Sequence, residues 1–119
     1  MKTILPTRNE VWGFHGTIRR HADPRAAWPI AVQTIRATTR CSDDAVRDFL
    51  DSTWGRHFAD EVSNELFQGH DLKTAIETAA DRWMKWKIDS RTERKYGIPR
   101  GLPYLTGLLT HCEIMAEAE

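Results

Sequence analysis

Residues 71–88 read DLKTAIETAADRWMKWKI, and this stretch decides the fold class. Asp71 is a favoured N-cap residue, and the apolar residues after it lie within about a 100° arc of a helix. These are Leu72, Ala75, Ile76, Ala79, Trp83 and Trp86. Further on the apolar stripe fails, because Ser90 and Arg94 occupy core positions. We predict one helix over 71–96 whose last two turns project into water or meet a partner.

Capping residues and apolar spacing predict four more helices around this one. Asp23 followed by Pro24, and Ser42, are signals for helix starts, whereas Gly55 and Gly69 are residues at which helices commonly end. The expected ranges are 23–40, 42–54, 56–68 and 103–117. The wide apolar face of the last range places it at the centre of the core.

The first 21 residues are less regular. Phe14 and Ile18 have helical spacing, but two nearby glycines each cost a helix about 1 kcal/mol relative to alanine. We expect residues 1–21 to be irregular or to form one short helix. A chain of 119 residues needs only one ordinary core. The expected fold is therefore all-α, a compact single-domain bundle of five or six helices over residues 1–119.

The apolar runs and the cysteines of the sequence predict the compartment of the protein. The N-terminus lacks the apolar run of a signal peptide, and the longest apolar run, residues 26–32, contains a proline. We therefore expect a cytoplasmic protein that does not enter a membrane. Cys41 and Cys112 show no CxxC spacing, so both are expected to be free thiols.

The net charge of zero hides four blocks of opposite sign. Residues 1–41 carry seven positive and two negative side chains, and residues 42–81 carry three and ten. Residues 82–100 carry seven and two, whereas residues 101–119 carry none and three. This polarised distribution is the most informative functional feature of the sequence.

The acidic block predicts a surface that binds a partner protein. Carboxylates one helical turn apart stand about 5–6 Å from each other, which approaches the spacing of phosphates along a nucleic-acid strand. Such a nucleic-acid mimic would engage a protein that handles nucleic acid. The face consists of Asp43, Asp44, Asp48, Asp51, Asp60, Glu61 and Glu65. The alternative is a solvated face, or one that pairs with basic segments of the same chain.

The basic block predicts the alternative function, direct binding of DNA or RNA. Its cations are interleaved with Trp83, Trp86 and Tyr96, the composition of a surface that tracks phosphates and stacks on bases. Both tryptophans fall on the core stripe, however, so packing is their expected role. The cations are Arg82, Lys85, Lys87, Arg91, Arg94, Lys95 and Arg100.

Catalysis and metal binding are not expected. His57 lies one turn from Asp60 and Glu61, which favours its charged form, and His111 precedes a cysteine on an apolar face. No established catalytic or phosphate-loop motif and no zinc-like ligand spacing occurs. We therefore expect a non-enzymatic protein without cofactor or metal.

Met84 and Ile88 lie one turn apart, away from the main stripe of the predicted helix. Two apolar residues there are expected to belong to an ordinary core, and one alternative is that they pack under the N-terminal segment. The remaining interpretations are a partner contact and the seam of a homodimer.

Four stretches resemble small accessory proteins encoded on plasmids and integrative conjugative elements of proteobacteria. They are residues 12–17 (WGFHGT), 21–24 (HADP), 55–60 (GRHFAD) and 97–107 (GIPRGLPYLTG). The resemblance implies an accessory protein of mobile DNA. Such proteins are often inhibitors of restriction or CRISPR systems, helpers of partition or transfer, or regulators. The resemblance assigns no role to any residue.

Overall fold

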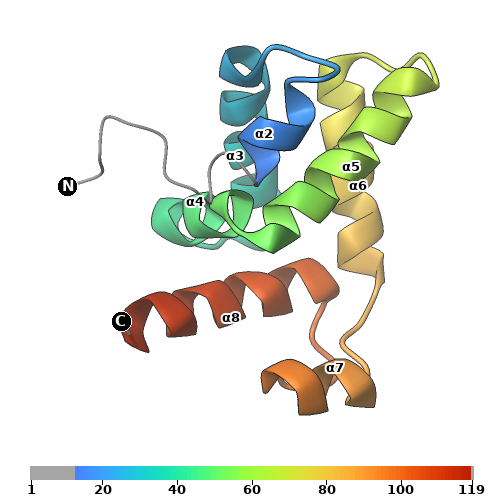
Figure 1. Cartoon of the computed structure of the whole chain (residues 1–119). Coiled ribbons are helices and arrows are strands. Elements are labelled where there is room, and N and C mark those ends of the chain that lie inside the picture. Colours follow the sequence, from blue (N-terminus) through green and yellow to red (C-terminus); the bar gives the residue numbers. More distant parts are fainter. Residues whose placement is uncertain (1–12, 119) are drawn as a thin grey trace.

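The computed structural model describes the backbone of residues 13–118 and the side chains of residues 13–114, and this part contains seven helices and no strand (Figure 1). They are α2 (Phe14–Ile18), α3 (Pro24–Thr39), α4 (Asp43–Asp51), α5 (Thr53–Phe67), α6 (Leu72–Lys85), α7 (Ser90–Tyr96) and α8 (Tyr104–Ala118). The predicted all-α class is confirmed. The predicted count of five or six helices is wrong, because the longest predicted helix is two helices.

The predicted N-caps close the starts of three helices. The carboxylate of Asp23 accepts a hydrogen bond from the Arg25 backbone N–H at 3.0 Å. In the same way Ser42 Oγ accepts from the Ala45 N–H at 3.2 Å. Asp71 begins α6 likewise, with a partner at 2.8 Å. Each cap satisfies a backbone donor that the first helical turn leaves without an intrahelical acceptor.

Aromatic rings from four helices meet in the core. Phe58 of α5 lies 6.2 Å from Phe14, 6.0 Å from Phe49 and 5.5 Å from Trp83, measured between ring centroids. All four rings are buried. α5 therefore packs against α2, α4 and α6, while α8 packs against α4 and α6. Leu105, Leu108 and Leu109 of α8 are fully buried, as the wide apolar face predicts.

The predicted helix over 71–96 is wrong beyond Lys85. At Trp86 the backbone becomes extended, with ψ 148°, and a second helix begins four residues later. Asp89 caps it, because its carboxylate accepts a hydrogen bond from the Thr92 N–H at 2.8 Å. The extended segment buries Ile88, which is 2% exposed, so its interpretation as an ordinary core residue is confirmed.

The expected break at Gly55 is also wrong. The chain leaves the helical conformation at Ser52, with φ −86° and ψ 177°, and Gly55 lies inside α5. A Cβ atom built on Gly55 would lie 2.6 Å from Leu50 Cα and would overlap the Leu50 carbonyl. Glycine is needed here because the start of α5 meets the backbone of α4 without space for a side chain.

The short helix expected near the N-terminus is α2, whose Phe14 and Ile18 are buried. Of the segment 1–21 that was expected to be irregular or to form one short helix, residues 1–12 lie outside the described residues. Among the described helices, none combines the length and the apolar character that crossing a bilayer requires.

Candidate nucleic-acid interface

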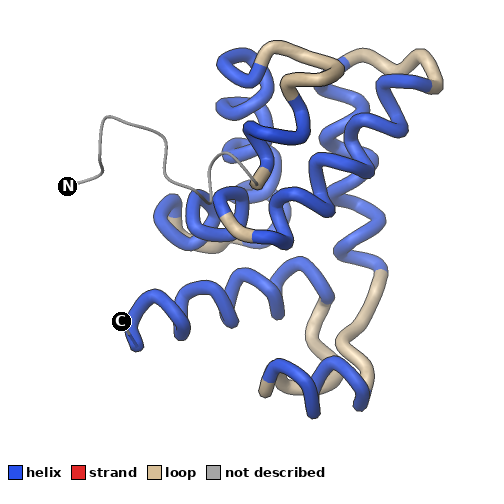
Figure 2. The backbone as a smooth tube through the Cα atoms, in the orientation of Figure 1, coloured by secondary structure: helices blue, strands red, loops and turns tan. Residues whose placement is uncertain are grey.

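Residues 86–104 form a protrusion between α6 and α8 that contains α7. Its two ends are paired by backbone hydrogen bonds from the Ile88 N–H to the Leu102 carbonyl at 2.9 Å and from the Tyr104 N–H to the Trp86 carbonyl at 2.8 Å. Figure 2 shows two loop stretches running side by side from α6 and α8 to α7. The pairing holds the protrusion as a defined element.

Two buried isoleucines anchor the base of the protrusion on α8. Ile88 and Ile98 are each 2% exposed. A Cβ atom on Gly107 of α8 would lie 2.9 Å from Ile98 Cγ2 and 3.0 Å from Ile88 Cγ1. The absence of a side chain at Gly107 therefore lets both isoleucines pack closely against the helix.

α7 itself buries none of its seven residues, and a helix this short is not stable alone. Besides the Asp89 cap, Gly97 ends it in the left-handed conformation at φ 70°. The ring of Tyr96 then contacts Trp54 of α5 at 5.0 Å and His111 of α8 at 5.9 Å between centroids. These caps and ring contacts fix the orientation of the helix.

A groove of about 470 Å³ lies between α7 and the start of α8, and we call it the aromatic–basic groove. Trp86 is 48% exposed, and its ring lies 6.0 Å from the ring of Tyr104 in an edge-on arrangement. Lys95 Nζ lies 5.2 Å from the ring centroid of Tyr96. The lining residues are Trp86, Lys87, Asp89, Arg91, Thr92, Lys95, Tyr96 and Tyr104.

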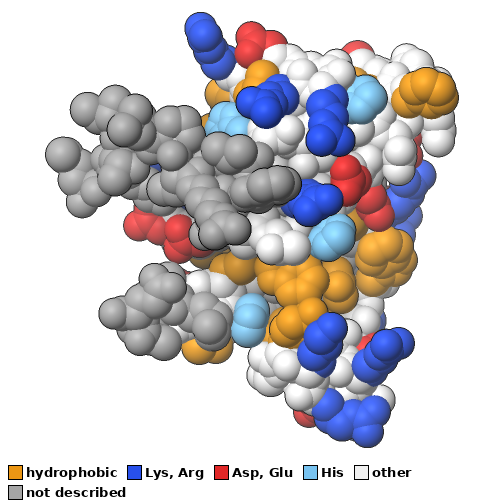
Figure 3. All heavy atoms as spheres, in the orientation of Figure 1, with side chains coloured by type: hydrophobic (Ala, Val, Ile, Leu, Met, Phe, Trp, Pro, Cys, Tyr) orange, Lys and Arg blue, Asp and Glu red, His pale blue; other side chains and the backbone are white. Residues whose placement is uncertain are grey.

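The charge of this groove is positive. Lys87, Arg91 and Lys95 line it together with one carboxylate, Asp89. That carboxylate is the N-cap of α7. Its hydrogen bonds with Thr92 lower its pKa. Figure 3 shows Lys and Arg side chains gathered over this end of the molecule.

Tyr104 presents a neutral phenol to the same groove. Burial raises the pKa of this side chain above its ordinary value, so the phenol stays protonated at neutral pH. The groove therefore offers aromatic rings and cations together, the combination that binds bases and phosphates.

Four of the seven predicted basic residues do not line this groove. Arg82 Nη2 lies 2.7 Å from Glu65 Oε1, and Lys85 Nζ lies 2.9 Å from Asp81 Oδ2. Arg100 stands 4.0 Å from Glu93, at the limit of an ion pair. Arg94 is exposed on α7. The structure thus brings together three of the predicted cations, Lys87, Arg91 and Lys95, in one groove.

The predicted acidic face is interrupted by pairing within the chain. Asp43 Oδ2 lies 3.1 Å from Arg47 Nε, and Asp43 Oδ1 lies 3.6 Å from Arg36 Nη1. Asp44 and Asp60 are exposed. Asp48 and Asp51 of α4 are half-buried, and both side chains have interaction partners.

Including Glu65 in an exposed acidic face is wrong. Its side chain is 2% exposed and pairs with Arg82 of α6 and, at 3.3 Å, with His70 Nε2. The neighbouring Glu61 is half-buried, and burial raises its pKa more than the Trp83 indole and the Arg82 charge lower it. Both carboxylates thus belong to the α5–α6 interface, so the exposed acidic surface is smaller than expected.

The histidine and cysteine candidates are spread over different elements of the fold. His57 is exposed on α5, and Cys41 and Cys112 are free. Burial raises the pKa of the Cys112 thiol to about 11, so it is protonated at neutral pH. Among the described side chains, no group of three His, Cys, Asp or Glu residues is placed to hold a metal ion.

Sequence reasoning missed the roles of Trp86 and Tyr104. The apolar stripe predicts Trp86 in the core, and the apolar face of 103–117 gives Tyr104 no other role, whereas both residues line the groove. The available signal was Asp89, an N-cap residue three positions before Thr92, at the place where the apolar stripe fails. A helix start there implies a break after Lys85, and that break frees Trp86.

Comparison with protein families, with curated proteins and with solved structures finds no match for this chain.

Proposed function

We propose that the protein binds single-stranded nucleic acid through the aromatic–basic groove of residues 86–104. The observation that carries this proposal is the half-exposed Trp86 ring beside Tyr104 in a groove with three cations. Every base has a face that stacks on an aromatic ring, and lysine and arginine neutralise the phosphates between bases.

A single strand fits this groove better than a duplex. Stacking on Trp86 requires a base whose face is free, which base pairs in a duplex do not offer. α7 has only seven residues and is held by caps and one tyrosine, so it is a short element to insert into a major groove. The protein would bind a strand without strong sequence preference.

The acidic face is the weaker candidate for the functional surface. Asp43 and Glu65 are paired within the chain, so fewer carboxylates remain for a partner protein. Binding of a nucleic-acid-handling protein through Asp44 and Asp60 stays a prediction. Charge reversal at these two residues is expected to leave oligonucleotide binding unweakened, which separates the two hypotheses.

Replacing Trp86 with alanine tests the proposal. Loss of one base–aromatic stack costs about 1–3 kcal/mol, so the dissociation constant for a labelled single-stranded oligonucleotide should rise by roughly tenfold. Fluorescence anisotropy at low salt measures this value for DNA and for RNA. The fold should persist, because the ring is half exposed.

Phe67→Ala is the matched control. Phe67 is 86% exposed at the end of α5, remote from α7 in Figure 1, and does not line the groove. Its replacement should leave the dissociation constant unchanged. Equal affinity of Trp86→Ala and the wild type, or equal weakening by both variants, would contradict a stacking role for Trp86.

A further inference from the structure

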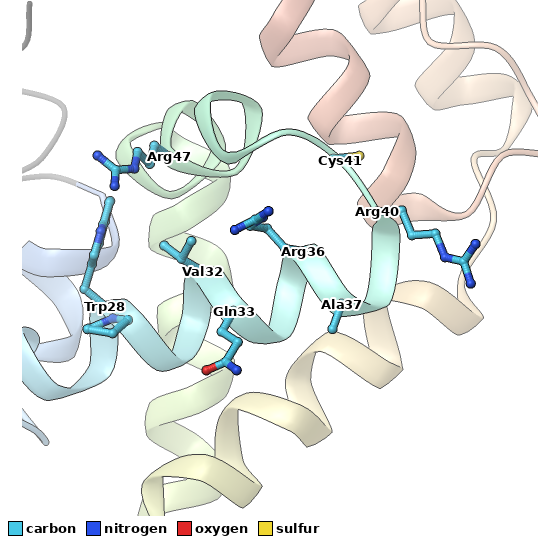
Figure 4. A pocket seen from close by; sticks show the side chains of 9 residues that line it. Trp28, Val32, Gln33, Arg36, Ala37, Arg40, Cys41 and Arg47 are labelled. Carbon is cyan, nitrogen blue, oxygen red and sulfur yellow. The ribbon is translucent and has the colours of Figure 1, made fainter.

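A second pocket, of about 710 Å³, lies along α3 and meets the start of α4 (Figure 4). Its volume falls within the range of about 300–1,000 Å³ that is typical of small-molecule sites. Three arginines line it: Arg36 and Arg40 come from the end of α3, and Arg47 comes from α4. None of the residues of the aromatic–basic groove contributes, so the two sites are separate.

The pocket carries an excess of positive charge. The described residues that line it include no Asp or Glu. One carboxylate at its edge, Asp43, stands 3.6 Å from Arg36 and 3.1 Å from Arg47. A single carboxylate shared by two guanidinium groups leaves donors of each free, because a guanidinium has five N–H groups. With Asp43 counted, the three lining arginines keep two positive charges in excess, which suits a doubly charged anion such as a phosphate monoester.

One end of the pocket has an apolar wall that includes an aromatic ring. Trp28 is held in place by stacking on His15, with 4.4 Å between ring centroids and 15° between ring planes. Val32 continues this apolar wall along α3. Figure 4 shows Arg36 and Arg47 extending toward the Trp28 end, whereas Arg40 extends the opposite way. Phosphate donors and an apolar, ring-accepting wall thus lie at the same end.

We propose that this pocket binds a nucleoside monophosphate. The phosphate accepts hydrogen bonds from those N–H groups of Arg36 and Arg47 that Asp43 leaves free. The base lies against Trp28 and Val32. A phosphate monoester carries about −1.5 to −2 charges at pH 7, which offsets the excess that the three lining arginines keep after Asp43 is counted. The base supplies the planar apolar surface that inorganic phosphate lacks.

Isothermal titration calorimetry with AMP, adenosine and inorganic phosphate tests both halves of the assignment. AMP is expected to bind at low salt, and to bind at least roughly tenfold more tightly than either adenosine or inorganic phosphate. The double variant Arg36→Gln/Arg47→Gln should weaken AMP binding by at least roughly tenfold, because both charge-assisted contacts are lost.

Arg25→Gln is the matched control, since Arg25 is an exposed arginine of α3 that does not line the pocket. It should leave AMP binding unchanged, and so should Trp86→Ala, which makes failure here distinguishable from failure of the proposed function. Absence of AMP binding at millimolar concentrations would overturn the assignment. So would equal affinity for AMP and inorganic phosphate, or equal loss in Arg25→Gln.

Discussion

Replacement of Gly55 by alanine is expected to lower the free energy of unfolding by about 3 kcal/mol, at the upper end of overpacking costs. The reason is the meeting of α4 and α5, where the new Cβ atom would lie 2.6 Å from Leu50 Cα. Backbone atoms cannot rotate away as a flexible side chain can, so one of the helices must shift. Thermal unfolding should show a midpoint lower by roughly 10 °C.

Gly107→Ala provides the matched comparison, because it also introduces a methyl group inside a helix. There the nearest atoms belong to the side chains of Ile98 and Ile88, at 2.9 and 3.0 Å, and not to backbone, so side-chain adjustment can relieve part of the overlap. Alanine also gains about 1 kcal/mol of helix propensity over glycine. Its effect should therefore be far smaller. A Gly55→Ala protein as stable as the wild type would contradict the close approach of α4 and α5.

Replacement of Arg82 by glutamine is expected to destabilise the protein by about 2 kcal/mol. Glu65 is 2% exposed, and removal of its partner leaves a buried carboxylate with only His70 beside it. Breaking a fully buried pair costs about 3–5 kcal/mol, but Arg82 is 49% exposed and already partly hydrated, which reduces the cost. Denaturant unfolding at neutral pH measures the difference.

Lys85→Gln is the control for this charge change, because Lys85 and Asp81 form an ion pair on the same helix that is 74% and 63% exposed. Its loss should cost at most about 0.5 kcal/mol. The double variant Glu65→Gln/Arg82→Gln should be more stable than Arg82→Gln alone, since the buried charge is gone. Additive losses in the double variant would show that burial of the Glu65 charge is not the cause.

Local signals predicted the helices whose caps and stripes agree. Asp23, Ser42 and Asp71 begin helices because their side chains accept hydrogen bonds from the first turn, and this is a property of a few adjacent residues. The buried stripe of α6 follows the predicted period as far as Trp83. These features could be predicted because neighbouring residues alone determine them.

Tertiary contacts determined the features that were predicted wrongly. Trp86 has the helical spacing of a core residue, but α6 ends before Trp86, because the chain must extend to bury Ile88 against α8. Glu65 has the spacing of a surface residue, but Arg82 from another helix neutralises it in the interior. Neither partner is visible in the local sequence, because each lies on a different helix.

The candidate site could be predicted only in part. The basic residues of 82–100 were identified from composition, but composition does not separate Lys87, which lines the groove, from Arg82, which pairs with Glu65. The groove also needs Tyr104, which is brought to Trp86 by their backbone hydrogen bond. Such an assembly depends on chain pairing over many residues.

The salt dependence of single-strand binding tests the central claim most directly. The logarithm of the association constant should fall linearly with the logarithm of the salt concentration, with a slope of about −0.7 for each phosphate contact. Lys87→Gln/Arg91→Gln/Lys95→Gln should weaken binding at low salt and flatten this slope by about 2. The exposed Lys73 of α6, which does not line the groove, supplies the control Lys73→Gln, whose slope should equal that of the wild type. Absence of binding at low salt, or an equal slope for the wild type and the triple variant, would contradict nucleic-acid binding by the aromatic–basic groove.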